Sequence, residues 1–243
     1  NEMRYLMLLS AWLLGFNALA SDVAREKKWA DEVLPSVLVG DPVWLKQADG
    51  HAFLGLYTPT SPAKAGLVVV HGIGVHPDWG LISGLRQQLP DAGYATLSIQ
   101  MPILQAEAKS EAYLPLFDQA ADRLALAVAD LKARGYNKVA IVAHSLGARM
   151  AHHYLTRASQ PDIAAWVAIG APAPLDSSKL TLPILDLYGQ NDLPAVLSHA
   201  TTRAVGLKHG KSAQVVVPSA DHFFAGQEAA LIEQVRRWLD ATL

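Results

Sequence analysis

The stretch VAHSLGARM, residues 142–150, decides the fold. An apolar run ends at His144, Ser145 follows it, and a helical pattern opens directly afterwards. A serine between small residues at a sharp strand-to-helix turn is typical of enzymes that attack carbonyl groups, because the turn exposes the hydroxyl. Gly147 is one such small residue, and Ala143 stands where these motifs usually carry glycine. Taken alone, however, the motif is more often a serine that caps a helix.

Short apolar runs recur along the chain on both sides of this stretch. They lack polar alternation, as expected of strands that are buried on both faces. The runs are GLVVVHG (66–72), ATLSIQM (95–101), KVAIVAH (138–144), AAWVAIG (164–170), PILDLYG (183–189) and AQVVVP (213–218). Amphipathic helical patterns separate them, so the sequence predicts a parallel sheet with helices on both faces. Two earlier strands, 42–47 and 51–57, are joined by Asp49-Gly50, a strong hairpin signal.

The composition narrows the possible functions. With 243 residues, 51% of them hydrophobic, the chain can bury a full core, and one domain is favoured. The net charge of −2 and the lack of basic runs argue against a nucleic-acid partner. The sequence has no cysteine, which excludes disulfides, thiolate metal sites and a cysteine nucleophile. We expect neither a metal nor another cofactor.

The N-terminal segment has the pattern of an export signal. Arg4 precedes an apolar stretch, residues 5–16, and Ala18-Leu19-Ala20 then supplies a small-x-small cleavage pattern. The apolar stretch is shorter than the ~20 residues that a membrane-spanning helix needs, so cleavage is favoured over anchoring. We predict a signal peptide over residues 1–20 and a helical lead-in over 21–42. The mature chain would then be periplasmic or secreted, with membrane contact only through an uncleaved signal.

Two further polar residues follow predicted strands near the C-terminal end. Asp192 lies in LYGQND and His222 lies in PSADHFF, each just after an apolar run. The carboxyl ends of parallel strands meet at one edge of a sheet, where ligands bind. In this arrangement Ser145 attacks, His222 moves the proton, and Asp192 orients the imidazole and stabilises its charged form. The coincidence of these signals at several strand ends favours catalysis over helix capping.

An anion site is expected on the loop that contains HGIG, residues 71–74. A backbone N–H from this loop, together with the N–H of the residue after the nucleophile, would stabilise negative charge on a substrate oxygen. We predict Ile73 and Leu146 as the two donors of this oxyanion hole. Gly74 is an alternative to Ile73, because the pattern leaves the register open by one residue.

Two other carboxylates compete with Asp192 for the role of the acid. Asp186 lies inside a predicted strand, and Asp221 adjoins His222 in the sequence. Neither position orients the imidazole well, so Asp192 is preferred.

Several histidines near the site also have competing interpretations. His144 is expected to pack behind Ser145, with its side chain directed away from the hydroxyl. His76 and Trp79 either line the mouth of a pocket or fix the loop that carries them. The pair His152-His153 could indicate a metal, but adjacent helical residues face different directions and no third ligand shares their spacing. Helix packing or exposure is therefore favoured for this pair.

Together, HGIG, AHSLG, GQND and DHFF resemble the α/β-hydrolase superfamily across nearly all of residues 43–243. The alanine in AHSLG and the HGIG loop resemble those of small bacterial lipases. The wider chain is similar to an uncharacterised family of exported bacterial α/β-hydrolase-like proteins, through DPVWLKQADGHAFLGLY, HPDWG and GYATLSIQMP. The resemblance implies an α/β-hydrolase domain over 43–243, built on a mostly parallel eight-stranded sheet. It also implies that Ser145, Asp192 and His222 form a catalytic triad.

The expected activity is hydrolysis of a small-molecule carboxylic ester through an acyl-enzyme. The same residues would also cleave amides or thioesters, and a non-catalytic envelope binding protein on the same fold is the competing class. Only APAPLDSSKLTL, residues 171–182, stands where many such enzymes insert a helical cap, and it is too short for one. Tyr113 and Leu114 are the other residues that could cover one side of the site. An open cleft of this kind favours short to medium acyl groups, because it buries few methylenes.

Overall fold

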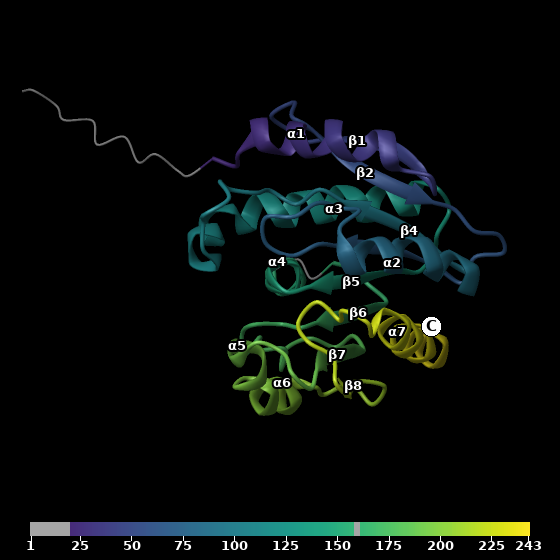
Figure 1. Ribbon diagram of the computed structural model, residues 1–243. Helices are drawn as coiled ribbons and strands as arrows, with labels where there is room; N and C mark the ends of the chain where they lie inside the picture. The colour runs from purple at the N-terminus through teal and green to yellow at the C-terminus, as the bar shows by residue number, and fades with distance from the viewer. Residues whose placement is uncertain (1–19, 158–160) are drawn as a thin grey trace, which may run out of the picture.

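The computed structural model describes residues 20–157 and 161–243, and an eight-stranded sheet forms its centre (Figure 1). The strand order is β1-β2-β4-β3-β5-β6-β7-β8. β2 pairs antiparallel with both β1 and β4, and the other neighbours are parallel. The strands are β1 (Asp41–Lys46), β2 (Ala52–Thr58), β3 (Ala65–Val70), β4 (Tyr94–Ile99), β5 (Val139–His144), β6 (Ala165–Ile169), β7 (Ile184–Gly189) and β8 (Ala213–Val217). The predicted mostly parallel sheet is confirmed.

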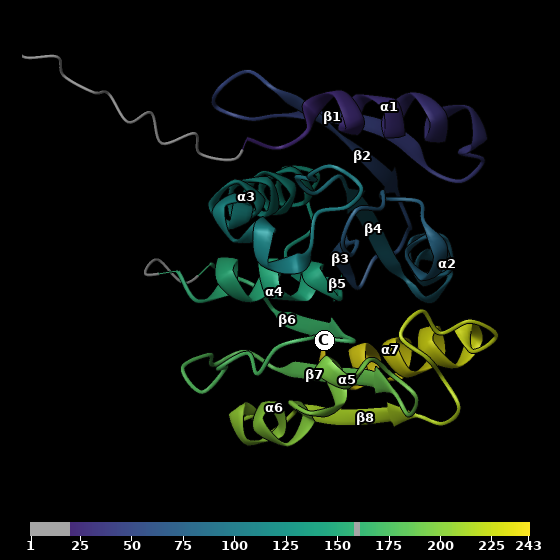
Figure 2. The ribbon, with the colours of Figure 1, turned by 60° about the vertical axis from the view of Figure 1, so that its left-hand side comes forward.

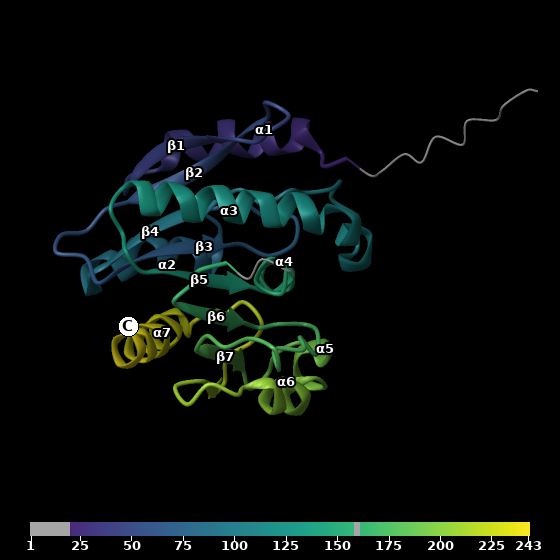
Figure 3. The same cartoon turned by 180° about the vertical axis from the view of Figure 1, so that it is seen from behind.

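Helices cover both faces of the sheet. In Figure 2, α3, α4 and α6 lie on one side, whereas α2 and α7 lie on the other, and Figure 3 shows the same division from behind. The α-helices are α1 (Val23–Val33), α2 (Gly80–Gln88), α3 (Phe117–Ala133), α4 (Leu146–Leu155), α5 (Pro194–Leu197), α6 (Ala200–Gly206) and α7 (Glu228–Thr242). Three short 3₁₀ segments are η1 (Leu34–Ser36), η2 (Leu89–Ala92) and η3 (Ser110–Leu116).

Alternate side chains of the central strands enter two separate cores. Val68 and Val70 of β3 pack with α3 and α4, whereas Leu67 and Val69 pack with α2 and α7. Successive side chains of a strand point to opposite faces, so a strand that is covered on both sides needs apolar residues at every position. This requirement explains why the central strands read as unbroken apolar runs.

The helical lead-in packs onto the antiparallel end of the sheet. α1 begins after Asp22, whose Oδ1 accepts the N–H of Arg25 at 2.9 Å and caps the helix. Ala30 and Val33 of α1 lie against two leucines of β2, and Figure 1 shows α1 beside β1 and β2. The sheet begins at Asp41, two residues before the predicted boundary at 43.

The connection between β6 and β7 contains no helix, so the fold has no large cap domain, as predicted. Within residues 20–157 and 161–243, no helix is long and apolar enough to cross a membrane. The predicted signal peptide, residues 1–20, lies outside the described residues except for its last position.

Candidate active site

Ser145 occupies a sharp turn between β5 and α4. Its backbone has φ 56° and ψ −123°, in a region that residues with side chains rarely adopt. The N–H of Ser145 donates to the Ile169 carbonyl at 2.8 Å, which ties the turn to β6. A Cβ at Gly147 would lie 2.4 Å from the His71 carbonyl oxygen, so this position admits only glycine. Ala143 is fully buried in β5, where the methyl group has room.

The three residues that the sequence predicted as a triad lie in one continuous line of hydrogen bonds. Ser145 Oγ and His222 Nε2 are 2.9 Å apart, and His222 Nδ1 lies 2.6 Å from Asp192 Oδ1. The carboxylate accepts the Nδ1–H proton, which leaves Nε2 as the acceptor for the serine hydroxyl. Ser145 follows β5, Asp192 follows β7 and His222 follows β8, so all three stand at the carboxyl ends of parallel strands.

Asp192 is held in its ionised form by its surroundings. Burial opposes ionisation, but hydrogen bonds from His222 and from the backbone N–H groups of Gly189 and Leu193 outweigh it and lower the pKa of Asp192. These contacts also fix both carboxylate oxygens. Asp192 can therefore orient the imidazole and stabilise its charged form.

The two competing carboxylates serve other purposes. Asp186 is buried in β7 and forms an ion pair with Arg203, with Nε and Oδ1 2.9 Å apart. Asp221 accepts the backbone N–H groups of Phe223 and Ala225 and so closes the turn after β8. Neither carboxylate contacts the His222 ring.

His144 lies differently from the sequence-based expectation. Its ring does not turn away from the site: it lines the same cavity as Ser145, and its centroid is 4.8 Å from that of His222. Its Nε2–H donates to the His222 backbone carbonyl at 2.9 Å. Burial, with a smaller contribution from the charge of His222, lowers the pKa of His144 to about 3. His144 is therefore a neutral neighbour of His222.

A largely apolar cavity of about 260 Å³ opens over Ser145. It is lined by Gly72, Ile73, Val75, Trp79, His144, Ser145, Leu193, His222 and Phe223. Trp79 and Phe223 meet edge to face, with centroids 5.5 Å apart. The lining contains no Lys, Arg, Asp or Glu, so the cavity suits an uncharged group.

Of His76 and Trp79, which were candidates either for the pocket mouth or for fixing the loop, only Trp79 lines this cavity. His76 packs instead against Trp29 of α1, with centroids 4.9 Å apart, and so fixes the loop. Tyr113, a predicted cover, is buried and its hydroxyl accepts the N–H of Leu104. Leu114 is exposed and, like Tyr113, is not part of the cavity lining.

The loop after β3 passes close to Ser145. A Cβ at Gly72 would lie 3.2 Å from Ser145 Cβ, so glycine permits this approach. The Nδ1–H of buried His71 donates to the Gly72 carbonyl at 2.8 Å, and its Nε2 accepts the N–H of Met101 at 3.0 Å. The C=O and N–H of a trans peptide point in opposite directions. His71 therefore fixes the direction of the Ile73 N–H.

The predicted oxyanion donors stand next to the serine. Leu146 is the first residue of α4, where backbone N–H groups have no acceptor inside the helix. Ile73 lines the cavity, whereas its alternative Gly74 is absent from the lining and its carbonyl accepts Arg25 Nη2 at 3.1 Å. Burial lowers the pKa of His71 to about 4, so this support of the loop stays neutral.

Sequence reasoning missed several residues that shape the site. Gly170, at the end of β6, has φ 55°, and a Cβ there would lie 3.1 Å from the His222 ring. A glycine as the last residue of the predicted strand, AAWVAIG, was the available signal. Leu193 and Phe223 adjoin Asp192 and His222 in the sequence, and no role was predicted for either, although Phe223 lies in DHFF. Arg25 lies in the predicted helical lead-in, to which the sequence assigned no role in the site.

The adjacent histidines of α4 have separate partners. His152 Nε2 lies 2.9 Å from the Asp176 carbonyl oxygen, and His153 Nε2 lies 2.8 Å from Asp118 Oδ1. In the described part of the chain, no group of three or more His, Asp or Glu side chains is placed to hold a metal ion.

Solved structures of hydrolases superpose on most of the chain. A dienelactone hydrolase from Anabaena variabilis matches with a TM-score of 0.68 and 23% identity, over 84% of this chain and 97% of its own. Est1E from Butyrivibrio proteoclasticus matches with a TM-score of 0.65 and 15% identity, over 83% and 98%. An esterase from Pyrococcus furiosus matches with a TM-score of 0.64 and 15% identity, over 83% of this chain and 92% of its own. The chain has the α/β-hydrolase fold.

Sequence comparison then places the chain in a particular family. It matches the family described as "Protein of unknown function (DUF3530)" over residues 23–115 and 105–241, and it belongs to that family. The match includes α1 as well as the sheet. No curated protein matches the chain.

Proposed function

We propose that the protein is a serine hydrolase that cleaves carboxylic esters of short to medium acyl chains through an acyl-enzyme. The observation that carries this proposal is the unbroken line of hydrogen bonds from Ser145 through His222 to Asp192, set beneath an apolar cavity. A hydroxyl, an imidazole and a carboxylate in this order are the parts that nucleophilic acyl transfer needs.

Acylation would proceed from this geometry without large rearrangement. His222 Nε2 takes the hydroxyl proton as Ser145 Oγ attacks the ester carbonyl, and Asp192 stabilises the imidazolium that forms. The N–H groups of Ile73 and Leu146 receive the negative charge on the carbonyl oxygen. His222 then protonates the departing alcohol. In the second half, water attacks the acyl-enzyme with His222 again as the base, and Ser145 is released.

The cavity supports an uncharged acyl or alcohol group of limited size. Its lining is mainly aromatic and aliphatic, and about 260 Å³ holds a small substituent. The similar structure from Pyrococcus furiosus is named as an esterase, which agrees with this substrate class. The fold alone does not choose the substrate, so the ester assignment rests on the site.

Ser145 is 8% exposed and lines the cavity, which supports an enzyme over a non-catalytic binding protein. A scaffold that had lost its activity would need no path from solvent to the hydroxyl. Amides and thioesters use the same nucleophile. A matched set of p-nitrophenyl ester, p-nitroanilide and thioester of one acyl group would rank the three leaving groups.

The test is labelling with a fluorophosphonate probe, in which the wild type is compared with Ser145→Ala. We expect one covalent adduct, which mass spectrometry places on Ser145, and none in the variant. Thermal unfolding of both proteins controls for folding. An adduct on a different residue, or no adduct on folded wild type, refutes the nucleophile assignment.

We further propose that residues 1–20 direct export and are removed, which would leave α1 near the start of the mature protein. The apolar stretch and the Ala18-Leu19-Ala20 pattern support this proposal. N-terminal sequencing of the protein recovered from a periplasmic fraction tests it. A mature chain that begins at Ser21 is expected, and an intact N-terminus in the cytoplasmic fraction contradicts it.

A further inference from the structure

Arg25 of α1 reaches across to the loop that carries Ile73. Its Nη2 donates to the Gly74 carbonyl at 3.1 Å, and its Nη1 donates to the Leu104 carbonyl in the segment between β4 and η3. One guanidinium therefore holds two loops that are separated by about thirty residues of sequence. Asp22, which caps α1, also donates its own N–H to the Ile103 carbonyl and anchors the start of the helix to the second loop.

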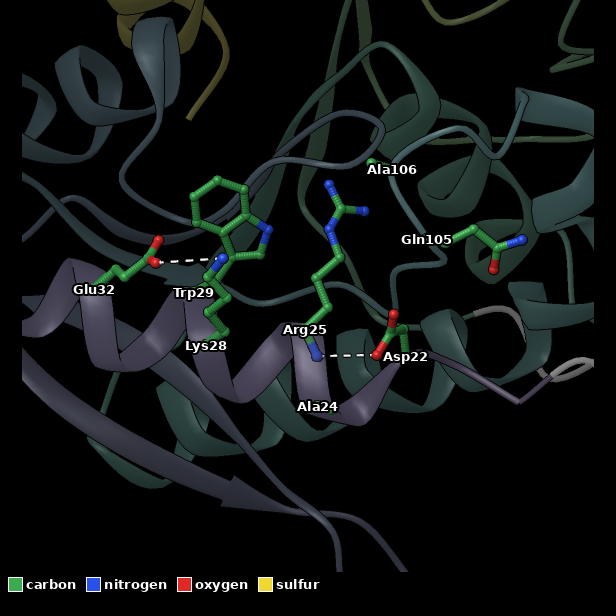
Figure 4. Close-up of a pocket in the computed structure, with 8 residues that line it drawn as sticks. All are labelled: Asp22, Ala24, Arg25, Lys28, Trp29, Glu32, Gln105 and Ala106. Carbon is green, nitrogen blue, oxygen red and sulfur yellow. Dashed lines mark hydrogen bonds and ion pairs between the residues drawn. The ribbon is translucent and has the colours of Figure 1, made fainter.

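Trp29 adds a second contact between α1 and the same loop. Arg25 and Trp29 are four residues apart and so share one face of the helix. Figure 4 shows both side chains extending from α1 into a surface hollow of about 390 Å³. The guanidinium carbon lies 5.9 Å from the Trp29 ring centroid, and the same ring packs against His76. α1 thus holds this loop at two points, at Gly74 through Arg25 and at His76 through Trp29.

The contact with Gly74 complements the contact made by His71. His71 holds the Gly72 carbonyl on one side of Ile73, and Arg25 holds the Gly74 carbonyl on the other. Because each peptide is planar, a fixed carbonyl fixes the whole unit. His71 thus fixes the peptide that carries the Ile73 N–H, Arg25 fixes the Gly74–Val75 peptide, and only the Ile73–Gly74 peptide lies between these two anchored units.

The composition of this loop explains why such anchors matter. Gly72 and Gly74 flank Ile73, and Gly74 has φ 66°, a conformation that is accessible to glycine at little cost. Glycine is also the residue with the most freedom to leave its conformation. A donor in an oxyanion hole is effective only if its direction is set before the reaction.

We propose that Arg25 is a positioning residue for the oxyanion hole, and that α1 belongs to the catalytic architecture rather than being only a lead-in. This inference deepens the proposed function and rests on it. Arg25 acts through the Gly74 carbonyl and touches neither substrate nor triad. Its loss should weaken stabilisation of the tetrahedral intermediate and leave binding of the ground-state ester nearly intact.

The test compares Arg25→Met, Arg25→Lys and Lys28→Met with the wild type. Methionine keeps much of the aliphatic stem but donates no hydrogen bond, and lysine, with a single nitrogen, is expected to restore one of the two carbonyl contacts. Lys28 lies on the same helix and lines the same hollow, but it forms an ion pair with Glu32 of α1 and not with the loop. Lys28→Met is therefore the matched control.

Loss of a direct oxyanion donor costs about 10²–10³ in kcat, and loss of a positioning contact should cost less. We therefore expect Arg25→Met to lower kcat about tenfold with KM changed by less than about twofold. Arg25→Lys should fall between it and the wild type, and Lys28→Met should match the wild type. The affinity for a boronic acid that mimics the tetrahedral intermediate should fall in parallel with kcat.

Hydrogen exchange gives a readout that does not depend on turnover. Peptides covering residues 71–79 should exchange faster in Arg25→Met, whereas peptides from α7 should not change. Unchanged kcat, or equal losses in kcat and in ground-state binding, overturns the positioning role. If the wild type does not react with the probe at Ser145, the proposed function is refuted. Hydrogen exchange still tests Arg25 in that case, because unchanged exchange of residues 71–79 in Arg25→Met would show that Arg25 does not hold the loop. If Arg25→Met does not fold, Arg25→Lys and Trp29→Phe replace it in the same kinetic and exchange measurements.

Discussion

His144 donates a hydrogen bond to the backbone carbonyl of His222, and the two imidazole rings lie 4.8 Å apart. The side chain before the proposed nucleophile thus holds the backbone of the proposed base. Because burial keeps His144 neutral, it places no positive charge beside His222. With His71, which holds the Gly72 carbonyl, two buried neutral histidines support the two halves of the proposed site.

Those two histidines predict that the fold weakens in mild acid. The unfolded chain gains protons on both near pH 6.5, whereas burial lowers the folded pKa of His144 to about 3 and that of His71 to about 4. The unfolded state therefore binds more protons across this window, and stability is lost as the pH falls through it. Each histidine should cost about 2 kcal/mol at pH 5 relative to pH 7.5. Urea unfolding at both pH values measures the loss.

A variant separates the contribution of His144 to the pH-dependent loss of stability from the contributions of the other titratable groups. His144→Asn removes one of the two groups and should reduce the pH-dependent loss by about 2 kcal/mol. The same pH dependence in His144→Asn as in the wild type would show that His144 does not titrate as described.

Asp192→Asn should abolish most activity while the domain stays folded. The amide cannot stabilise the imidazolium, and losses of up to ~10⁴-fold in kcat are expected for such acids. Steady-state kinetics on a p-nitrophenyl ester and a thermal melt measure the two effects. Asp221→Asn, which alters a turn outside the hydrogen-bond line, is the control. If the control were the inactive protein, the acid would have to be reassigned.

Gly147→Ala should disrupt both packing and activity. The new methyl group would meet the His71 carbonyl oxygen at 2.4 Å, and backbone atoms have little room to move. Overpacking of this kind costs about 1–3 kcal/mol, and the displaced His71 also shifts the loop that carries Ile73. Gly210→Ala is the control, since a Cβ there meets no atom within 4 Å. Equal melting temperatures for the two variants would contradict the expected clash.

The ester series from acetate to palmitate should give its highest kcat/KM at short acyl chains. Each buried methylene contributes roughly 0.8 kcal/mol, and a cavity of about 260 Å³ buries few of them. Trp79→Ala should move the optimum toward longer chains because it removes a wall of the cavity. Trp44→Ala, at an exposed tryptophan of β1, should leave the series unchanged. A maximum at palmitate in the wild type contradicts the small open site.

Much of the architecture follows from local patterns. Unbroken apolar runs predict strands that are covered on both sides, and the strands of the structure agree with these runs to within about two residues at each end. Ser145, Asp192 and His222 each follow such a run, so the parallel sheet alone brings them to one edge. Their proximity was therefore predictable, whereas the 2.6 Å and 2.9 Å contacts are not properties of any local pattern.

The remaining features depend on contacts between distant segments. His144 was expected to face away from Ser145, but the β8 loop returns to place the His222 carbonyl within its reach. His76 was a pocket candidate, and α1, about fifty residues earlier, draws it toward Trp29 instead. In both cases the partner lies on an element whose position only the folded chain defines. Propensity and periodicity carry no information about such pairs.

The short β6–β7 connection leaves the cavity uncovered, with Phe223 50% and Leu193 44% exposed at its rim. Under the proposed mechanism no segment within residues 20–157 and 161–243 would have to open before the product departs, so we expect product release not to limit turnover. The same access admits other nucleophiles. Under that mechanism an alcohol in the solvent would reach the acyl-enzyme by the route that water takes, and the acyl group would be transferred to the alcohol as well as to water.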